Sequence, residues 1–116
     1  KKIEALAVTE IKSINSFFDY QAKYSKGYAK HILPAKLSKK NYNKCLSLAL
    51  KAHKILKCKG ITRSDFRFYN NKFYLLETNT QPGLTSLSLV PEIAKYKKIS
   101  FLKLINWIIA DASTNR

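Results

Sequence analysis

The feature that most constrains the fold of this chain is an alternating pattern on both sides of Asn70-Asn71. Residues 61–69 alternate between a face that carries arginine and aspartate and a face that carries phenylalanine, and residues 73–79 form a return strand. Two strands of this kind around a turn signal are typical of an antiparallel hairpin. This hairpin is the clearest element that the sequence predicts.

Two of the few acidic residues in the chain lie on the same hairpin. Of seven acidic residues in the chain, Asp65 and Glu77 fall on its two strands, and Asn79 follows Glu77 by two positions. Because side chains alternate across a strand, Asn79 shares the face of Glu77. Two carboxylates and an amide oxygen are hard ligands that suit Mg²⁺, which completes its shell with waters and phosphates. The alternative is a pair of solvated strand acids that face arginines.

The register of the hairpin decides between these two interpretations. Directly opposed residues of an antiparallel pair share a face. A three-residue turn pairs Asp65 with Glu77 and Arg63 with Asn79, whereas a two-residue turn places the two carboxylates on opposite faces. The apolar residues fit either register. The metal hypothesis therefore requires an odd turn or a β-bulge.

Arginines flank Asp65 at positions 63 and 67. Each could form a surface salt bridge, which contributes little to stability. Each could instead handle an anion, because a guanidinium can stabilise a developing oxyanion or hold a carboxylate by a forked bond. Arg63 is the better candidate, since it lies nearest Asn79 in the register with the odd turn.

A polar loop at residues 80–87 follows the hairpin and has Pro82-Gly83 at its centre. Gly83 allows the backbone to approach a ligand closely. Ser86 and Ser88 lie at the start of a helix expected over residues 88–97, and helix N-termini bind carboxylates and phosphates. Ordinary N-capping accounts for either serine alone.

The rest of the chain predicts further strands and helices around this hairpin. A helix should begin after Ser38 and end near Lys57, before Gly60, with an apolar stripe on one face. The fold class is α/β (α+β), with a mainly antiparallel sheet and flanking helices. The remaining expected elements are a strand at 3–12, a long loop at 13–27, a short strand at 28–34 and a last helix from Ser100 to about Asp111. The helix stripe consists of Tyr42, Cys45, Leu46, Ala49, Ala52, His53 and Leu56.

Four of eight consecutive residues in the loop at 13–27 are aromatic. Residues 17–24 read FFDYQAKY. The aromatic side chains could form the packed interior of the loop, or they could belong to a lid that excludes water over a phosphate. Lys23 would then reach the phosphoryl group.

The net charge of +15 raises nucleic acid or an anionic membrane as a partner. The lysines are scattered in pairs and form no long tract, which favours a Lys-rich surface instead. We therefore expect neither nucleic acid nor membrane as a partner. Two cysteines are too few for a disulfide scaffold and suit a reducing cytoplasm. Cys45 and His53 are expected in the helix core and not as ligands.

Four segments, in chain order, resemble the motifs of one enzyme family. Residues 17–24 match a FYDYEAKY loop, and residues 60–66, GITRSDF, match a G-x-x-R-x-D-F strand. Residues 75–85, LLETNTQPGLT, match LLE-x-NT-x-PG-[ML]-T, and residues 88–91 match SLVP. Together they resemble the D-alanine–D-alanine ligases, which are ATP-grasp enzymes. The resemblance covers about residues 4–110.

The resemblance implies a role for each matching residue. The enzymes of this family phosphorylate the carboxylate of one D-alanine with ATP, and the amine of a second D-alanine then attacks the acyl phosphate. Metal ligands for two Mg²⁺ ions, with Mn²⁺ as an alternative, would be Asp65, Glu77 and Asn79. Arg63 and the backbone N–H of Gly83 would form the oxyanion site. Ser88 and the Leu89 backbone would bind the second D-alanine. Lys23 and Tyr24 would come from the closing loop, with Lys23 near the γ-phosphate of ATP, and Phe17 and Leu76 would line the nucleotide pocket.

The chain departs from the family pattern at Phe18, Gln21 and Thr62, where Tyr, Glu and Gly are usual. The family proteins are also much longer. Residues 1–116 would therefore be a C-terminal ATP-grasp portion that lacks the N-terminal and ATP-lid subdomains and is inactive alone. We expect a homodimeric, cytoplasmic parent enzyme. Another ATP-grasp carboxylate–amine ligase and a basic nucleic-acid-binding module remain the alternatives.

Overall fold

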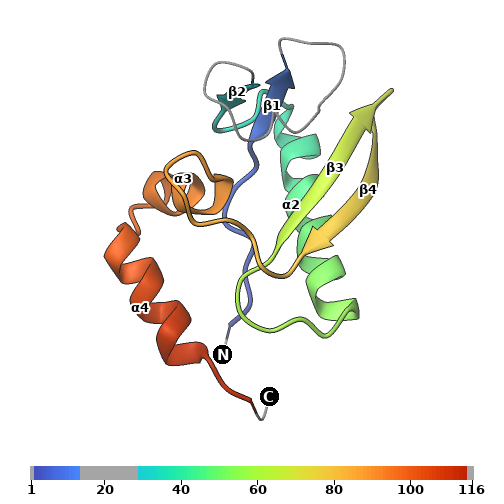
Figure 1. Ribbon diagram of the computed structural model, residues 1–116. Helices are drawn as coiled ribbons and strands as arrows, with labels where there is room; N and C mark the ends of the chain where they lie inside the picture. Colours follow the sequence, from blue (N-terminus) through green and yellow to red (C-terminus); the bar gives the residue numbers. More distant parts are fainter. Residues whose placement is uncertain (1, 14–28, 115–116) are drawn as a thin grey trace.

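The structure is a computed structural model that describes residues 2–13 and 29–114 (Figure 1). Within these ranges the strands form two separate two-stranded antiparallel sheets, and the chain also forms three helices. The expected α+β class is thus confirmed, although the strands are divided between two sheets. The elements are β1 (Glu10–Ser13), β2 (Ala29–Ile32), α2 (Lys39–Ile55), β3 (Arg63–Tyr69), β4 (Lys72–Asn79), α3 (Leu89–Tyr96) and α4 (Phe101–Asp111).

The expected hairpin is the β3–β4 pair. Its turn has two residues, because Tyr69 pairs with Lys72. Asn70 and Asn71 have φ values of 51° and 60°, in the left-handed region. Two successive left-handed residues match the right-handed twist of the flanking strands, and asparagine tolerates this backbone better than most residues. The Asn-Asn signal therefore marks the turn correctly.

Helix α2 begins and ends through local hydrogen bonds. The Ser38 hydroxyl accepts from the Asn41 backbone N–H at 3.2 Å, which confirms the expected N-cap. At the other end Lys57 adopts a φ of 54°, and the Cys58 N–H donates to the His53 carbonyl at 3.0 Å. This is the Schellman arrangement, with lysine at the position that glycine usually occupies. The helix thus ends before Gly60, whose φ of 70° serves the following loop.

The apolar stripe of α2 is mostly confirmed. Cys45 and Ala52 are buried, and Tyr42 and His53 are half-buried. Leu56 is an exception, with 59% of its surface exposed. It lies at the C-cap, beyond the last helical residue, so its side chain no longer follows the buried face.

The strand expected at residues 3–12 is wrong over most of its length. Only Glu10–Ser13 pairs, with β2, and within the described residues no strand lies beside residues 2–9. A strand needs a partner for its backbone groups. Residues 2–9 run through the middle of the molecule as an irregular segment (Figure 1), held where the Val8 N–H donates to the Tyr42 hydroxyl at 3.0 Å and the Val8 carbonyl accepts from Ala35 at 2.9 Å.

Strand β2 and the C-terminal helices agree with expectation. Pro34 follows β2, and Ser100 caps α4 by accepting from the Lys103 N–H at 3.1 Å. None of the helices within the described ranges is long and apolar enough to cross a bilayer. The loop at 13–27 lies almost wholly outside the described residues, and so do the candidate residues Phe17, Lys23 and Tyr24.

The core of the described part of the chain is small. Five residues are buried, and Leu104 is the largest of the aliphatic ones. Large apolar side chains lie at the surface instead, Ile109 with 67% of its surface exposed and Leu102 with 70%. Contiguous apolar side chains at a protein surface are typical of regions that contact further protein. The buried residues are Ala35, Cys45, Ala52, Ala94 and Leu104.

Candidate active site on the β3–β4 hairpin

A β-bulge places the two carboxylates of the hairpin opposite each other. Near the turn the register follows from the two-residue loop, so Phe66 lies opposite Leu75. One step further Asp65 lies opposite Glu77, which leaves Leu76 as the extra residue on β4. The bulge shifts the register by one residue, and a shift of one moves side chains to the other face. It therefore meets the requirement that the sequence left open.

Arg63 lies beside both carboxylates. Its Nε and Nη2 atoms donate to the two oxygens of Asp65 at 2.7 and 3.0 Å, and Nη2 lies 3.7 Å from Glu77 Oε1. The side chains of Arg63 and Asp65 are 23% and 27% exposed, so water screens this forked pair only in part. Arg67 lies nearer the turn, opposite Tyr74, and is exposed. Of the two arginines, Arg63 is the one that lies opposite Asn79.

Asn79 lies at the open end of the hairpin, opposite Arg63. Its side-chain oxygen accepts from the Gln81 N–H at 2.9 Å, which starts the polar loop after β4. This Asx turn fixes the carbonyl of the side chain at the point where the chain leaves the sheet. Arg63, Asp65, Glu77 and Asn79 therefore form one cluster, which we call the hairpin cluster.

Gly83 and Ser88 lie against each other across the loop. A Cβ atom at Gly83 would lie 2.8 Å from the Ser88 hydroxyl oxygen, so only glycine fits without a shift. The same hydroxyl accepts from the Thr85 N–H at 2.9 Å and lies 2.7 Å from Thr85 Oγ1. Ser88 occupies the N-cap position of α3, but its side chain makes no capping hydrogen bond. Ordinary N-capping therefore does not account for Ser88.

Part of the hairpin cluster faces an open cavity of about 1660 Å³ between α2, β3 and α3. Arg63, Asp65 and Glu77 line it, as does Leu76, which is 67% exposed at the bulge. Leu89, the first residue of α3, also lines this cavity. Within the described part of the chain, Asn79, Gly83 and Ser88 lie outside its lining.

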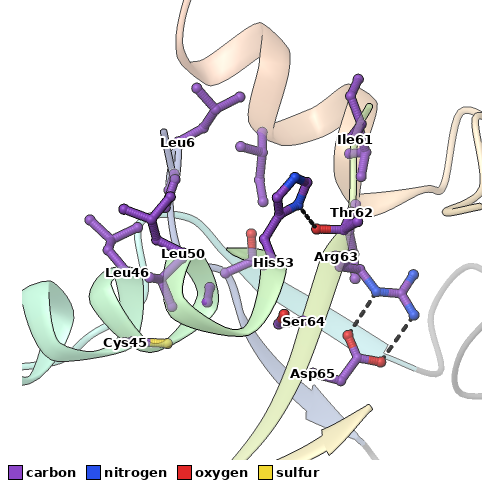
Figure 2. Close-up of a pocket in the computed structure, with 18 of the residues that line it drawn as sticks. Leu6, Cys45, Leu46, Leu50, His53, Ile61, Thr62, Arg63, Ser64 and Asp65 are labelled. Atoms are coloured by element: carbon purple, nitrogen blue, oxygen red, sulfur yellow. Dashed lines mark hydrogen bonds and ion pairs between the residues drawn. The ribbon is translucent and has the colours of Figure 1, made fainter. Parts of the chain in front are cut away.

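Two polar contacts of this region escaped the sequence analysis. His53 Nδ1 lies 2.8 Å from Thr62 Oγ1, beside the hairpin cluster (Figure 2), and His31 Nδ1 lies 3.2 Å from Glu92 Oε1, which joins β2 to α3. The partners of the first pair are 9 residues apart and those of the second are 61 residues apart, and no motif predicts either pair. Burial raises the pKa of the Cys45 thiol to about 11, so this thiol stays protonated near neutral pH and is a poor nucleophile.

The residues of the hairpin cluster suit a hard cation. Among residues 2–13 and 29–114, no three histidine, cysteine, aspartate or glutamate side chains gather as a metal site. Asp65 and Glu77 instead offer two carboxylates on one face, and Asn79 offers an amide oxygen nearby. Such a set fits Mg²⁺, which takes one or two carboxylates together with waters and substrate phosphates, and it does not suit zinc.

The fold agrees with that of solved enzymes. A D-alanine--D-alanine ligase from Bacillus anthracis complexed with ATP superposes with a TM-score of 0.74 at 31% identity, over 91% of this chain and 35% of that chain. A second structure of the Bacillus anthracis ligase gives a TM-score of 0.75. The fold is therefore the C-terminal part of an ATP-grasp fold.

The family of the chain follows from its sequence relatives. The family model described as D-ala D-ala ligase C-terminus matches residues 1–110, and the chain belongs to this family. It is 59% identical over 114 residues to a D-alanine--D-alanine ligase of Pelagibacter ubique, and 50% identical over 114 residues to one of Caulobacter sp.. Each alignment covers 97% of this chain. The chain spans 38% and 35% of the length of these two relatives.

Proposed function

We propose that this chain is the C-terminal part of a longer D-alanine–D-alanine ligase, called the parent protein below. The observation that carries the proposal is the hairpin cluster, in which Asp65 lies opposite Glu77 and Arg63 opposite Asn79. A bulge that brings scarce carboxylates onto one face of a strongly basic chain is poorly explained by solvation alone. The family match over residues 1–110 supports the same function.

The proposed reaction has two steps. An oxygen of the carboxylate of the first D-alanine attacks the γ-phosphorus of ATP, the bond to ADP breaks, and an acyl phosphate forms. The amine nitrogen of the second D-alanine then attacks the acyl carbon to give a tetrahedral intermediate. This intermediate expels phosphate, and the nitrogen loses a proton to leave the dipeptide, a precursor for peptidoglycan.

Each described site residue has a task in this reaction. Asp65, Glu77 and Asn79 would hold two Mg²⁺ ions, which when bound neutralise charge on the transferred phosphoryl group. Arg63 and the backbone N–H of Gly83 stabilise the oxyanion of the tetrahedral intermediate, because fixed donors aimed at developing charge are effective in a partly dry site. Ser88 and the Leu89 N–H bind the carboxylate of the second D-alanine.

Leu76 is proposed to line the nucleotide pocket. The bulge leaves this apolar side chain 67% exposed beside Glu77, where an adenine ring could cover it. Phe17 would line the same pocket, and Lys23 and Tyr24 would close over the phosphates. These three residues lie outside the described part of the chain, and the family resemblance alone supports their roles.

The parent protein is proposed to be cytoplasmic and homodimeric, and this chain alone is proposed to be inactive. An ATP-grasp enzyme clamps ATP between two subdomains, and the chain spans 38% and 35% of the length of the Pelagibacter ubique and Caulobacter sp. ligases. The substrates therefore meet only half of their contacts here. The large apolar side chains at the surface suit association with further protein.

The test is D-alanine-dependent phosphate release from ATP, measured on the parent protein and on this chain. The proposal expects activity in the parent protein and none in the chain. If the parent protein releases phosphate only with a different amino acid, another carboxylate–amine ligase is the correct function. Absence of ATP turnover with any amino or hydroxy acid would overturn the proposal.

A further inference from the structure

A hydrogen bond joins α2 to Thr62, the residue that directly precedes β3. His53, in the last turn of α2, has its Nδ1 atom 2.8 Å from the hydroxyl oxygen of Thr62, and both residues are half-buried. The carbonyl of His53 also accepts from the Cys58 N–H at 3.0 Å. The bond between the two side chains thus joins the end of α2 to the residue that directly precedes β3, across a short loop.

Thr62 directly precedes Arg63, the guanidinium of the hairpin cluster. Figure 2 shows the Thr62 side chain reaching back to His53 while Arg63 projects to the other side, toward Asp65. Neighbouring residues in extended chain point to opposite sides. A bond that fixes Thr62 against α2 therefore also fixes the backbone of Arg63, and it does so without contacting the guanidinium.

We propose that His53 and Thr62 are positioning residues, whose hydrogen bond holds Arg63 in its forked contact with Asp65. This inference rests on the proposed function of Arg63 as an oxyanion donor. A donor that stabilises a transition state must stand in place before charge develops, and small displacements of such groups reduce the rate strongly. Arg63 has a long flexible side chain, so the position of its backbone limits where the guanidinium can settle.

The test uses four variants of the parent protein, in two matched pairs. Thr62→Val removes the hydroxyl at nearly constant size, and Thr62→Ser keeps it. His53→Phe removes the ring nitrogens, and His53→Asn keeps a polar atom close to the position of Nδ1. We expect kcat to fall about tenfold in Thr62→Val and in His53→Phe, with the KM values for ATP and D-alanine nearly unchanged. Thr62→Ser and His53→Asn should restore most of the rate.

The double variant distinguishes positioning from general weakening. If the two residues act through one bond, Thr62→Val combined with His53→Phe should be no slower than either variant alone. A merely structural bond would lower the melting temperature but leave kcat intact well below that temperature. An unchanged kcat in Thr62→Val, or additive losses in the double variant, would overturn the proposal.

A second readout does not depend on turnover. The ¹⁵N–¹H resonance of Arg63 Nε, identified by its loss in Arg63→Lys, reports the 2.7 Å bond to Asp65. We expect Thr62→Val to shift or broaden this resonance and Thr62→Ser to leave it in place. If the wild-type parent protein lacks ligase activity, the proposed function fails, and the resonance alone decides the positioning role. An identical resonance in Thr62→Val would then refute it.

Discussion

Gly83 and Ser88 lie so close together that a methyl group on Gly83 would meet the Ser88 hydroxyl oxygen at 2.8 Å. This close approach lies in the loop between the hairpin cluster and α3. It also connects two residues with different proposed tasks, since Gly83 serves the oxyanion and Ser88 serves the second D-alanine. A substitution at Gly83 should therefore alter the position of the Ser88 hydroxyl.

We predict that Gly83→Ala in the parent protein displaces the Ser88 hydroxyl and weakens binding of the second D-alanine. Loss of one hydrogen bond to a charged group corresponds to an increase in KM of about tenfold or more. Steady-state kinetics at varied D-alanine concentration measure this change. In a Ser88→Ala background the added methyl group no longer meets an oxygen, so the further rise in KM should be small. Equal effects of Gly83→Ala in both backgrounds would contradict the clash.

The carboxylates of the hairpin cluster should control the Mg²⁺ requirement. We predict that Asp65→Asn in the parent protein lowers turnover about 100-fold or more, because even the supporting residues of metal sites contribute 10–100-fold. Glu77→Gln should act in the same direction. Activity measured over a Mg²⁺ titration, together with circular dichroism to verify the fold, provides the test. Arg67→Gln, nearer the turn, is the matched control, and a normal Mg²⁺ profile in Asp65→Asn would exclude the metal role.

The Asn70-Asn71 turn should tolerate glycine and resist alanine. Both residues have left-handed backbone angles, where an ordinary side chain costs about 1 kcal/mol. We predict that Asn71→Ala accelerates hydrogen exchange of the β3–β4 amides about fivefold, the equivalent of that free energy. Asn71→Gly should leave exchange unchanged or slow it. Faster exchange in the glycine variant than in the alanine variant would show that the backbone angle is not the cause.

Cys45 should be the less reactive of the two thiols. Burial raises its pKa from 9.0 to about 11, and the thiolate is the form that reacts. Cys58 is half-buried, so we predict that iodoacetamide labels Cys58 first at pH 8. Labelling of Cys45 should require unfolding or a pH near 11. Peptide mapping by mass spectrometry after timed alkylation measures both rates, and equal rates in the folded protein would refute the burial.

The same pKa shift links Cys45 to stability. The pKa is higher in the folded chain than in the unfolded chain, so the unfolded state loses its proton first as pH rises. The contribution of the protonated Cys45 thiol to the free energy of unfolding is complete below pH 9 and is lost as pH rises through about 11. The difference between wild type and Cys45→Ala in unfolding free energy should therefore narrow over this window.

Local signals in the sequence predicted much of the fold. The hairpin and the Ser38 and Ser100 caps depend on residues that are neighbours in sequence, and all three agree with the structure. The strand expected at 3–12 depends on a partner, and the pattern of one segment says nothing of whether a partner exists. Leu56 fits the helical period but lies past the last helical turn, because Lys57 turns the chain.

The sequence indicates which residues belong to the candidate site, but it does not determine the strand register that brings them together. The apolar residues of the hairpin fit either pairing, so only the structure locates the bulge at Leu76. The bond between His53 and Thr62 joins α2 to the loop before β3, and composition gives no sign of it. Residue types therefore indicated the chemistry, while the geometry that unites them came from tertiary structure.

The bulge also restricts how related hairpins can change in length. Asp65 and Glu77 share a face only because one extra residue on β4 compensates for an even turn. A single deletion or insertion between them would reverse the face of one carboxylate, whereas a paired change would not. Relatives that lengthen or shorten this hairpin should therefore do so two residues at a time, or exchange the bulge for an odd turn.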